Sequence, residues 1–188
     1  MRAAFADPVL DAQGAFRALL HAMSHPGRVV ALDAAPDAPA PLMPAAAAAL
    51  LTLADAETPV WTDAAGEALD WLRFHTGAPF VADPRDAAFL LATGAPPALD
   101  ALDAGTDEAP QEGATLIAQL PALAEGRGWR LTGPGVEHEH RLAAEGLPPG
   151  FAAQWAANAA RFPRGVDVIL CAGPRLAALP RTTRLAEG

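Results

Sequence analysis

The sequence predicts an α/β fold, a three-layer sandwich in which helices flank a mixed β-sheet. Helix-like and strand-like segments alternate along the whole chain, and the strand-like segments crowd toward the C-terminus. The chain has 188 residues, of which 52% are hydrophobic. This length can bury one sizeable core but does not divide comfortably into two. We therefore expect a single domain over residues 1–188.

The helices are predicted from apolar spacing and from proline. The clearest covers residues 10–23, and Pro26 and Gly27 end it. Its apolar residues recur at the spacing of one helix face, at Phe16, Leu19, Leu20 and Met23. A proline-rich loop over residues 34–44 follows a first short strand. The other helical segments are 44–53, 97–104 and 149–162, whereas 64–75 is ambiguous.

Short apolar runs, several of them bounded by glycine, proline or aspartate, are typical of strands. Asp83 and Pro84 fit an N-cap and the first position of a helical turn. The strand-like segments are 28–32, 59–62, 87–93, 113–120, 128–131, 166–171 and 176–179, and 79–82 is a short apolar stretch.

Composition excludes several function classes. With a net charge of −9, the chain as a whole lacks the excess positive charge that binding to nucleic acid or to anionic membrane surfaces needs. The chain has no lysine, which excludes a Schiff base, a pyridoxal-phosphate anchor and a P-loop lysine. We therefore expect no cofactor of that kind. A phosphate-bearing ligand would need a local cluster of arginines.

No run approaches the roughly 20 apolar residues of a membrane span, and no signal peptide is apparent, so we expect a cytoplasmic protein. The single cysteine, Cys171, cannot form an intramolecular disulfide. It follows three apolar residues and is interpreted as a small buried hydrophobe rather than a reactive thiol.

One segment near the C-terminus has the chemistry of an anion site. Arg181 and Arg184 flank the hydroxyls of Thr182 and Thr183. A guanidinium forms a planar fork that fits phosphate or phosphonate oxygens, and hydroxyls can complete the hydrogen bonding. The alternative is a solvated chain end whose arginines pair with surface carboxylates.

Other segments carry weaker signals. Gly133 and Gly135 bracket a turn whose backbone N–H groups could approach an anion, although a plain tight turn explains them too. Arg73 and His75 would share a face if they lay on a strand, where they could bind an anion or transfer a proton. A structural histidine is the alternative. The stretch 137–140 reads EHEH, which favours a solvated charged loop over a metal site.

Several of these segments, in order and over nearly the whole chain, resemble the PhnH family. The first matching segment, residues 16–27, reads FRALLHAMSHPG. The other matching segments are 50–55, 58–61, 72–76, 105–106, 113–117, 130–135, 162–167 and 180–183. The resemblance implies a fold similar to pyridoxal-phosphate-dependent transferases but without the cofactor.

The resemblance also implies a role in phosphonate breakdown, within a carbon–phosphorus lyase core complex that includes PhnG, PhnI and PhnJ subunits. That complex is associated with replacing the adenine of ATP by an alkylphosphonate, which yields a ribose 1-alkylphosphonate 5-triphosphate. The chain would be a transferase subunit rather than an autonomous enzyme, and which subunit holds the catalytic groups does not follow from the sequence.

We hypothesise that the segments described above line one pocket for phosphate or phosphonate. The candidate ligand-binding residues are Arg181, Thr182, Thr183, Arg73, His75, Gly133 and Gly135. The alternatives are a non-catalytic adaptor in the same complex and an independent protein that binds nucleotide or phosphonate. Family members also pair, so a homodimer is expected, with Trp61, Trp71 or Trp155 as possible anchors unless they are core residues.

Overall fold

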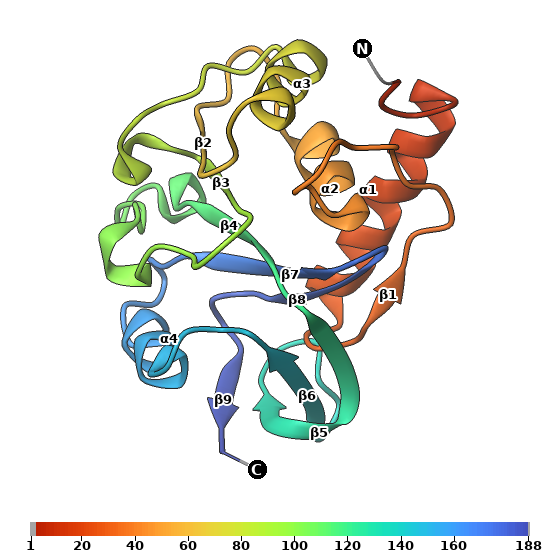
Figure 1. Cartoon of the computed structure of the whole chain (residues 1–188). Helices are drawn as coiled ribbons and strands as arrows, with labels where there is room; N and C mark the ends of the chain where they lie inside the picture. Colours follow the sequence, from red (N-terminus) through yellow and green to blue (C-terminus); the bar gives the residue numbers. More distant parts are fainter. Residues whose placement is uncertain (1–2, 188) are drawn as a thin grey trace.

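A six-stranded mixed sheet forms the centre of the molecule in the computed structural model, which describes residues 3–187. The strand order is β1-β8-β7-β4-β3-β2 (Figure 1). The four strands from β2 to β7 are parallel, whereas β8 runs antiparallel to both β7 and β1. The strands are β1 (Val30–Ala31), β2 (Val60–Thr62), β3 (Phe89–Ala92), β4 (Thr115–Gln119), β7 (Asp167–Ala172) and β8 (Arg175–Leu179).

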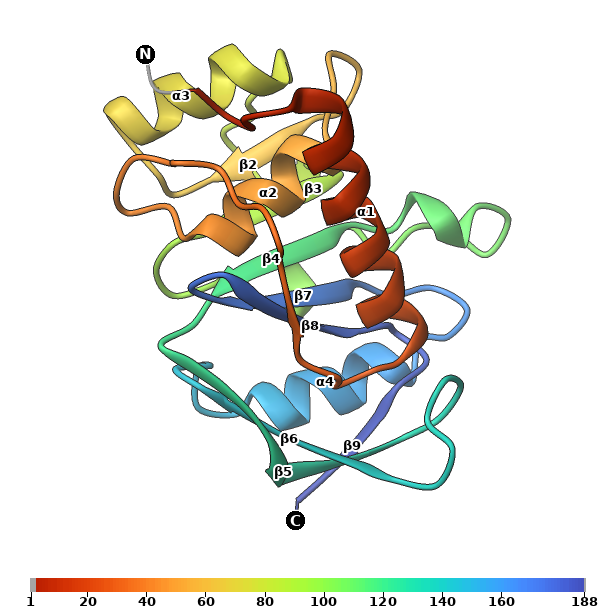
Figure 2. The ribbon, with the colours of Figure 1, turned by 90° about the vertical axis from the view of Figure 1, so that its right-hand side faces the viewer.

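Three helices cover one face of this sheet (Figure 2). They are α1 (Pro8–Ser24), α2 (Pro44–Leu53) and α3 (Glu67–Thr76). Asp7 caps α1 by accepting hydrogen bonds from the N–H groups of Val9 and Leu10, both at 3.0 Å. Five successive alanines, residues 45–49, are buried in α2. Such small side chains allow the helix to approach the sheet closely.

The opposite face is covered by one helix and a second sheet rather than by helices alone. Helix α4 (Phe151–Ala159) lies beside a three-stranded antiparallel sheet of order β6-β5-β9. Its strands are β5 (Ala122–Thr132), β6 (His140–Glu145) and β9 (Arg184–Ala186). The predicted mixed sheet with helices is confirmed, but the sequence did not predict β6 or β9, and it predicted only the end of β5.

Several smaller expectations are corrected. The ambiguous stretch 64–75 contains α3, and the expected helix over 97–104 is only one 3-10 turn, η2 (Leu99–Ala101). The short apolar stretch 79–82 contributes a single bridge, between Phe80 and Val60. Asp83 caps a second 3-10 turn, η1 (Pro84–Asp86), as expected; a third, η3 (Pro110–Glu112), precedes β4.

Buried apolar residues fill the space on both sides of the central sheet. Cys171 is among them, as predicted, and burial raises the pKa of its thiol well above the ordinary value. Trp71 and Trp155 are each 1% exposed, so neither can anchor a contact with another chain. Within residues 3–187, no helix combines the length and apolar character needed to cross a bilayer.

Candidate functional site

The predicted anion segment forms a turn that joins the two sheets. The chain leaves the central sheet at the end of β8 and enters the small sheet at β9. Between them, the N–H of Thr183 donates a 2.8 Å hydrogen bond to the carbonyl oxygen of Pro180. Arg181 and Thr182 are the two central residues of this turn, whereas Arg184 begins β9.

Arg181 is held inside the fold by a carboxylate. Its backbone N–H and its Nη2 each lie 2.7 Å from the carboxylate of Asp167, which begins β7. Its Nε donates to the same carboxylate at 3.2 Å, and its Nη1 donates to the carbonyl oxygen of Pro110. The side chains of Arg181 and Asp167 are only 12% and 16% exposed. Most donors of this guanidinium are therefore already used by the protein.

Glycines bring other segments close to this ion pair. A Cβ atom on Gly113 would lie 2.5 Å from the carbonyl oxygen of Gly165 and 3.0 Å from Nη1 of Arg181. Residues 162–167 are in turn joined to α4, because the amide of Asn158 exchanges two hydrogen bonds with the backbone of Val166. The segments that resembled the PhnH family at 113–117, 162–167 and 180–183 thus meet around Arg181.

The glycine turn at 133–135 lies next to the same segment. A Cβ on Gly133 would lie 2.9 Å from the carbonyl oxygen of Thr182, and Gly135 packs against Ser24 and Pro26 at the end of α1. His140 ties this region further, since its Nε2 lies 3.1 Å from the carbonyl oxygen of Gly27 and 3.2 Å from Glu125. His140, the last residue of the expected solvated loop at 137–140, is therefore partly buried and begins β6.

A cleft of about 270 Å³ opens beside the turn. It is lined by Pro134, Ala159, Phe162, Arg181, Thr182 and Arg184. Arg184 is exposed and, among the residues that the structure describes, forms no ion pair. Phe162 is 64% exposed and supplies an apolar wall. The cleft therefore combines one unpaired guanidinium, one hydroxyl-bearing residue and an aromatic side chain, a combination that suits a small oxyanion with an apolar substituent.

Thr183 does not belong to the cleft. It is fully buried, and its carbonyl oxygen accepts a 2.8 Å hydrogen bond from Nε1 of Trp155. Its Oγ1 is buried and has no hydrogen-bond partner among residues 3–187. Thr182 and Thr183 were predicted together, but of the two only Thr182 lines the cleft, whereas the side chain of Thr183 is buried.

Arg73 and His75 are not brought to this site, so the single pocket that we hypothesised from the sequence is wrong. Both lie on α3, at the opposite end of the molecule from β9 (Figures 1 and 2). The guanidinium of Arg73 lies 5.7 Å from the ring centre of Phe80, and the ring of His75 contacts those of Trp71 and Phe74. The expectation assumed a strand, whereas a helix directs residues two apart to different sides.

The residues missed by the sequence reasoning are Asp167, Phe162 and Pro134. The pairing of Asp167 could have been predicted from one signal in the sequence: it is an acidic residue at the start of an apolar strand, and an arginine-bearing segment follows that strand. The other two lie in segments that resemble the family, at 162–167 and 130–135, but their meeting in the cleft depends on contacts between distant segments.

Comparison with known proteins identifies the class to which this fold and cleft belong. A family model described as bacterial phosphonate metabolism protein (PhnH) matches residues 3–186. The chain therefore belongs to the PhnH family.

Two curated proteins are similar along most of their length. One, from Rhizobium meliloti (strain 1021), is 43% identical over 97% of this chain and 94% of its own length. It is named alpha-D-ribose 1-methylphosphonate 5-triphosphate synthase subunit PhnH. The other, from Stutzerimonas stutzeri, is 38% identical over 92% of this chain and 85% of its own length, and is named putative C-P lyase subunit protein HtxG.

Proposed function

We propose that this chain is a subunit of a carbon–phosphorus lyase core complex in phosphonate catabolism. There it assists the transfer of an alkylphosphonate to the ribose of ATP with loss of adenine. The observation that carries this proposal is the full-length similarity to a protein named as the PhnH subunit of ribose 1-methylphosphonate 5-triphosphate synthase. The partners would be PhnG-, PhnI- and PhnJ-like subunits, and the complex would work in the cytoplasm.

The cleft beside Arg184 is the proposed contact with the anionic reactant. Transfer of a phosphonate to a nucleoside triphosphate brings two anions together, and a fixed guanidinium would offset their repulsion. Arg184 supports this role because its charge is not used by an ion pair with any described residue. The hydroxyl of Thr182 would complete the hydrogen bonds; of the 133–135 turn only Pro134 lines the cleft, and it has no N–H to donate.

The test is Arg184→Ala in the assembled complex, measured as formation of the 5-triphosphate product from ATP and methylphosphonate. We expect the rate to fall by at least about tenfold, because one charge-assisted hydrogen bond stabilises by roughly 1.5–3 kcal/mol. Arg175→Ala is the matched control, since Arg175 is also an exposed strand arginine but lies outside the cleft. Equal rates for both variants and the unmodified chain would remove Arg184 from the mechanism.

The second candidate is a non-catalytic adaptor. The partly buried ion pair between Arg181 and Asp167 favours it, because the guanidinium of Arg181 then stabilises the fold rather than binding a ligand. If Arg184→Ala leaves product formation unchanged while omission of the whole chain abolishes complex assembly, the adaptor is the better description.

The third candidate is an independent nucleotide- or phosphonate-binding protein. Titration of the isolated chain with ATP and with methylphosphonate distinguishes it. Heat of binding in either titration, lost in Arg184→Ala, supports independent binding. No heat in either titration rejects this candidate.

A homodimer of the isolated chain would use α1. Of the six exposed large hydrophobic residues among those described, four lie on this helix: Val9, Leu10, Phe16 and Leu20. Three of them, Val9, Phe16 and Leu20, recur at helical spacing on one exposed face. In an isologous pair, the same apolar face of a second copy would cover it.

We also propose that the fold is a cofactor-less relative of the pyridoxal-phosphate-dependent transferases. The parallel strands β2, β3, β4 and β7 with helices packed on them support this relation. The lack of lysine is consistent with it, because no internal aldimine can form. A structural superposition with such transferases tests it: matching strand order would support the relation and a different order would reject it.

A further inference from the structure

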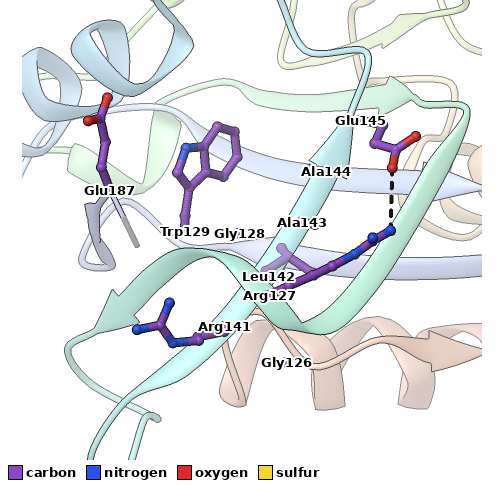
Figure 3. Close-up of a pocket in the computed structure, with 10 residues that line it drawn as sticks. All are labelled: Gly126, Arg127, Gly128, Trp129, Arg141, Leu142, Ala143, Ala144, Glu145 and Glu187. Atoms are coloured by element: carbon purple, nitrogen blue, oxygen red, sulfur yellow. Dashed lines mark hydrogen bonds and ion pairs between the residues drawn. The ribbon is translucent and has the colours of Figure 1, made fainter.

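The hairpin of β5 and β6 carries a hollow of about 720 Å³, shown in Figure 3. It is lined by residues 126–129 of β5, by residues 141–145 of β6 and by Glu187 after β9. None of these residues lines the cleft beside Arg184. The hollow therefore constitutes a second surface feature of the small sheet.

A bulge in β5 creates the hollow. Glu125 and Trp129 both pair with Leu142 of β6, so residues 126–128 loop out of the ladder. Gly126 and Gly128 have positive φ angles of 81° and 83°. A Cβ on Gly128 would lie 2.5 Å from the carbonyl oxygen of Leu142. Glycine at these positions is needed for the bulge, so the hollow is built into the backbone rather than formed by movable side chains.

Strand β6 presents a free edge at this hollow. The order β6-β5-β9 leaves β6 with a neighbour on one side only. Because side chains alternate along a strand, contact with five consecutive residues indicates that the hollow follows the strand's backbone. Every second residue of an edge strand directs its N–H and C=O away from the sheet. Among the described residues, we find no backbone hydrogen bond from β6 to any segment other than β5.

Trp129 supplies a rigid aromatic anchor beside this edge. Its ring stacks on Phe151 with 5.7 Å between centroids, and Phe151 stacks on the buried Trp155 at 6.1 Å. The indole itself remains partly exposed in the hollow. Partly exposed tryptophan held by packed neighbours is typical of the energetic centre of protein–protein contacts.

The charges around the hollow balance. Arg127 pairs with Glu145 at 3.4 Å, and Arg141 lies 3.7 Å from Glu139. Two arginines and two glutamates, Arg127, Arg141, Glu145 and Glu187, line the hollow. A polyphosphate would gain little from such a neutral surface, whereas a polypeptide with both signs of charge can match it.

We propose that the edge of β6, with Trp129, is a docking groove for an extended segment of another subunit, which adds as a strand beside β6. The unpaired backbone groups specify the chemistry of the occupant, because another peptide backbone offers the complementary row of donors and acceptors. This inference rests on the proposed membership of a multi-subunit complex.

The test compares two charge reversals on the same sheet. Arg141→Glu lies in the groove, whereas Arg130→Glu lies directly opposite on β5 and outside it. Both arginines lie within 4 Å of Glu139, so both variants lose the same kind of surface ion pair. Each variant is co-expressed with the other complex subunits. We expect Arg141→Glu to reduce co-elution about tenfold and Arg130→Glu less than about twofold.

Hydrogen exchange gives the second readout. In the assembled complex, we expect amides of residues 140–145 to exchange at least about tenfold more slowly than in the isolated chain, while those of β2, an edge strand of the central sheet, do not change. Co-elution of Arg141→Glu at the unmodified level, or unprotected β6 amides in the complex, overturns the groove while leaving membership intact. Protection of β6 by ATP alone assigns the hollow to a nucleotide and also overturns it. An unmodified chain that does not co-elute rejects both the proposed function and the groove.

Discussion

Arg181 and Arg184 differ in what surrounds their guanidiniums. Arg181 is enclosed by Asp167 and the carbonyl oxygen of Pro110, whereas Arg184 is exposed beside the cleft. A buried charge that loses its partner is costly, because the remaining charge stays desolvated. We therefore assign stability to Arg181 and ligand contact to Arg184, although both belong to one short segment.

Replacement of Arg181 should destabilise the fold. Arg181→Ala leaves the Asp167 carboxylate, which is only 16% exposed, without its main partner. We expect a loss of roughly 3 kcal/mol in the free energy of unfolding, measured by chemical denaturation. Arg184→Ala is the control, with a change below about 0.5 kcal/mol. An equal loss in the free energy of unfolding for both variants would mean that the ion pair between Arg181 and Asp167 does not stabilise the fold.

Cys171 should resist thiol reagents while the protein is folded. The side chain is fully buried, and burial raises the pKa of its thiol, so the reactive thiolate is scarce at neutral pH. Alkylation by iodoacetamide, followed by mass spectrometry, should modify Cys171 at least about a hundredfold faster in denaturant. Rapid modification of the native chain would mean that β7 opens far more readily than its packing suggests.

At the scale of elements, the exposed apolar residues of α1 (Val9, Leu10, Phe16 and Leu20, called the α1 stripe) predict how the isolated chain associates. Leu20→Glu places a charge in the apolar surface that would be buried in the proposed homodimer. Light scattering of the isolated chain should show a weakening of the dimer by at least about a hundredfold in Kd. Phe74→Glu, on the exposed surface of α3, is the matched control and should leave association unchanged. Dimers that persist in Leu20→Glu would place the contact elsewhere.

Elements with local signals could be predicted from the sequence, and those that depend on distant pairing could not. Helix α1 follows from its apolar spacing, although it begins at Pro8 rather than at residue 10, and α2 follows from the proline at its first turn. Strand β6 could not be predicted, because it is a polar-ended edge strand whose pairing depends on the bulge in β5. The site was predicted in part for the same reason. Thr182 and Arg181 follow from the motif, but Arg73 and His75 would share a face only on a strand, and this ambiguous stretch forms α3.

As a whole molecule, the chain is proposed to be one part of a larger catalyst. Two separate surfaces of the small-sheet side have different tasks in this account. The cleft beside Arg184 is the proposed contact with the anionic reactant, and the β6 groove is the proposed docking surface for a neighbouring subunit. The helical side carries the α1 stripe, so association of the isolated chain and assembly into the complex would use different faces (Figure 2).

The most direct test of this account is reconstitution of the core complex with and without the chain, followed by phosphorus NMR of a reaction with ATP and methylphosphonate. The account predicts that ribose 1-methylphosphonate 5-triphosphate accumulates only when the chain is present, and that adding it back restores the signal. Product formation at the same rate in a complex that lacks the chain would contradict the account.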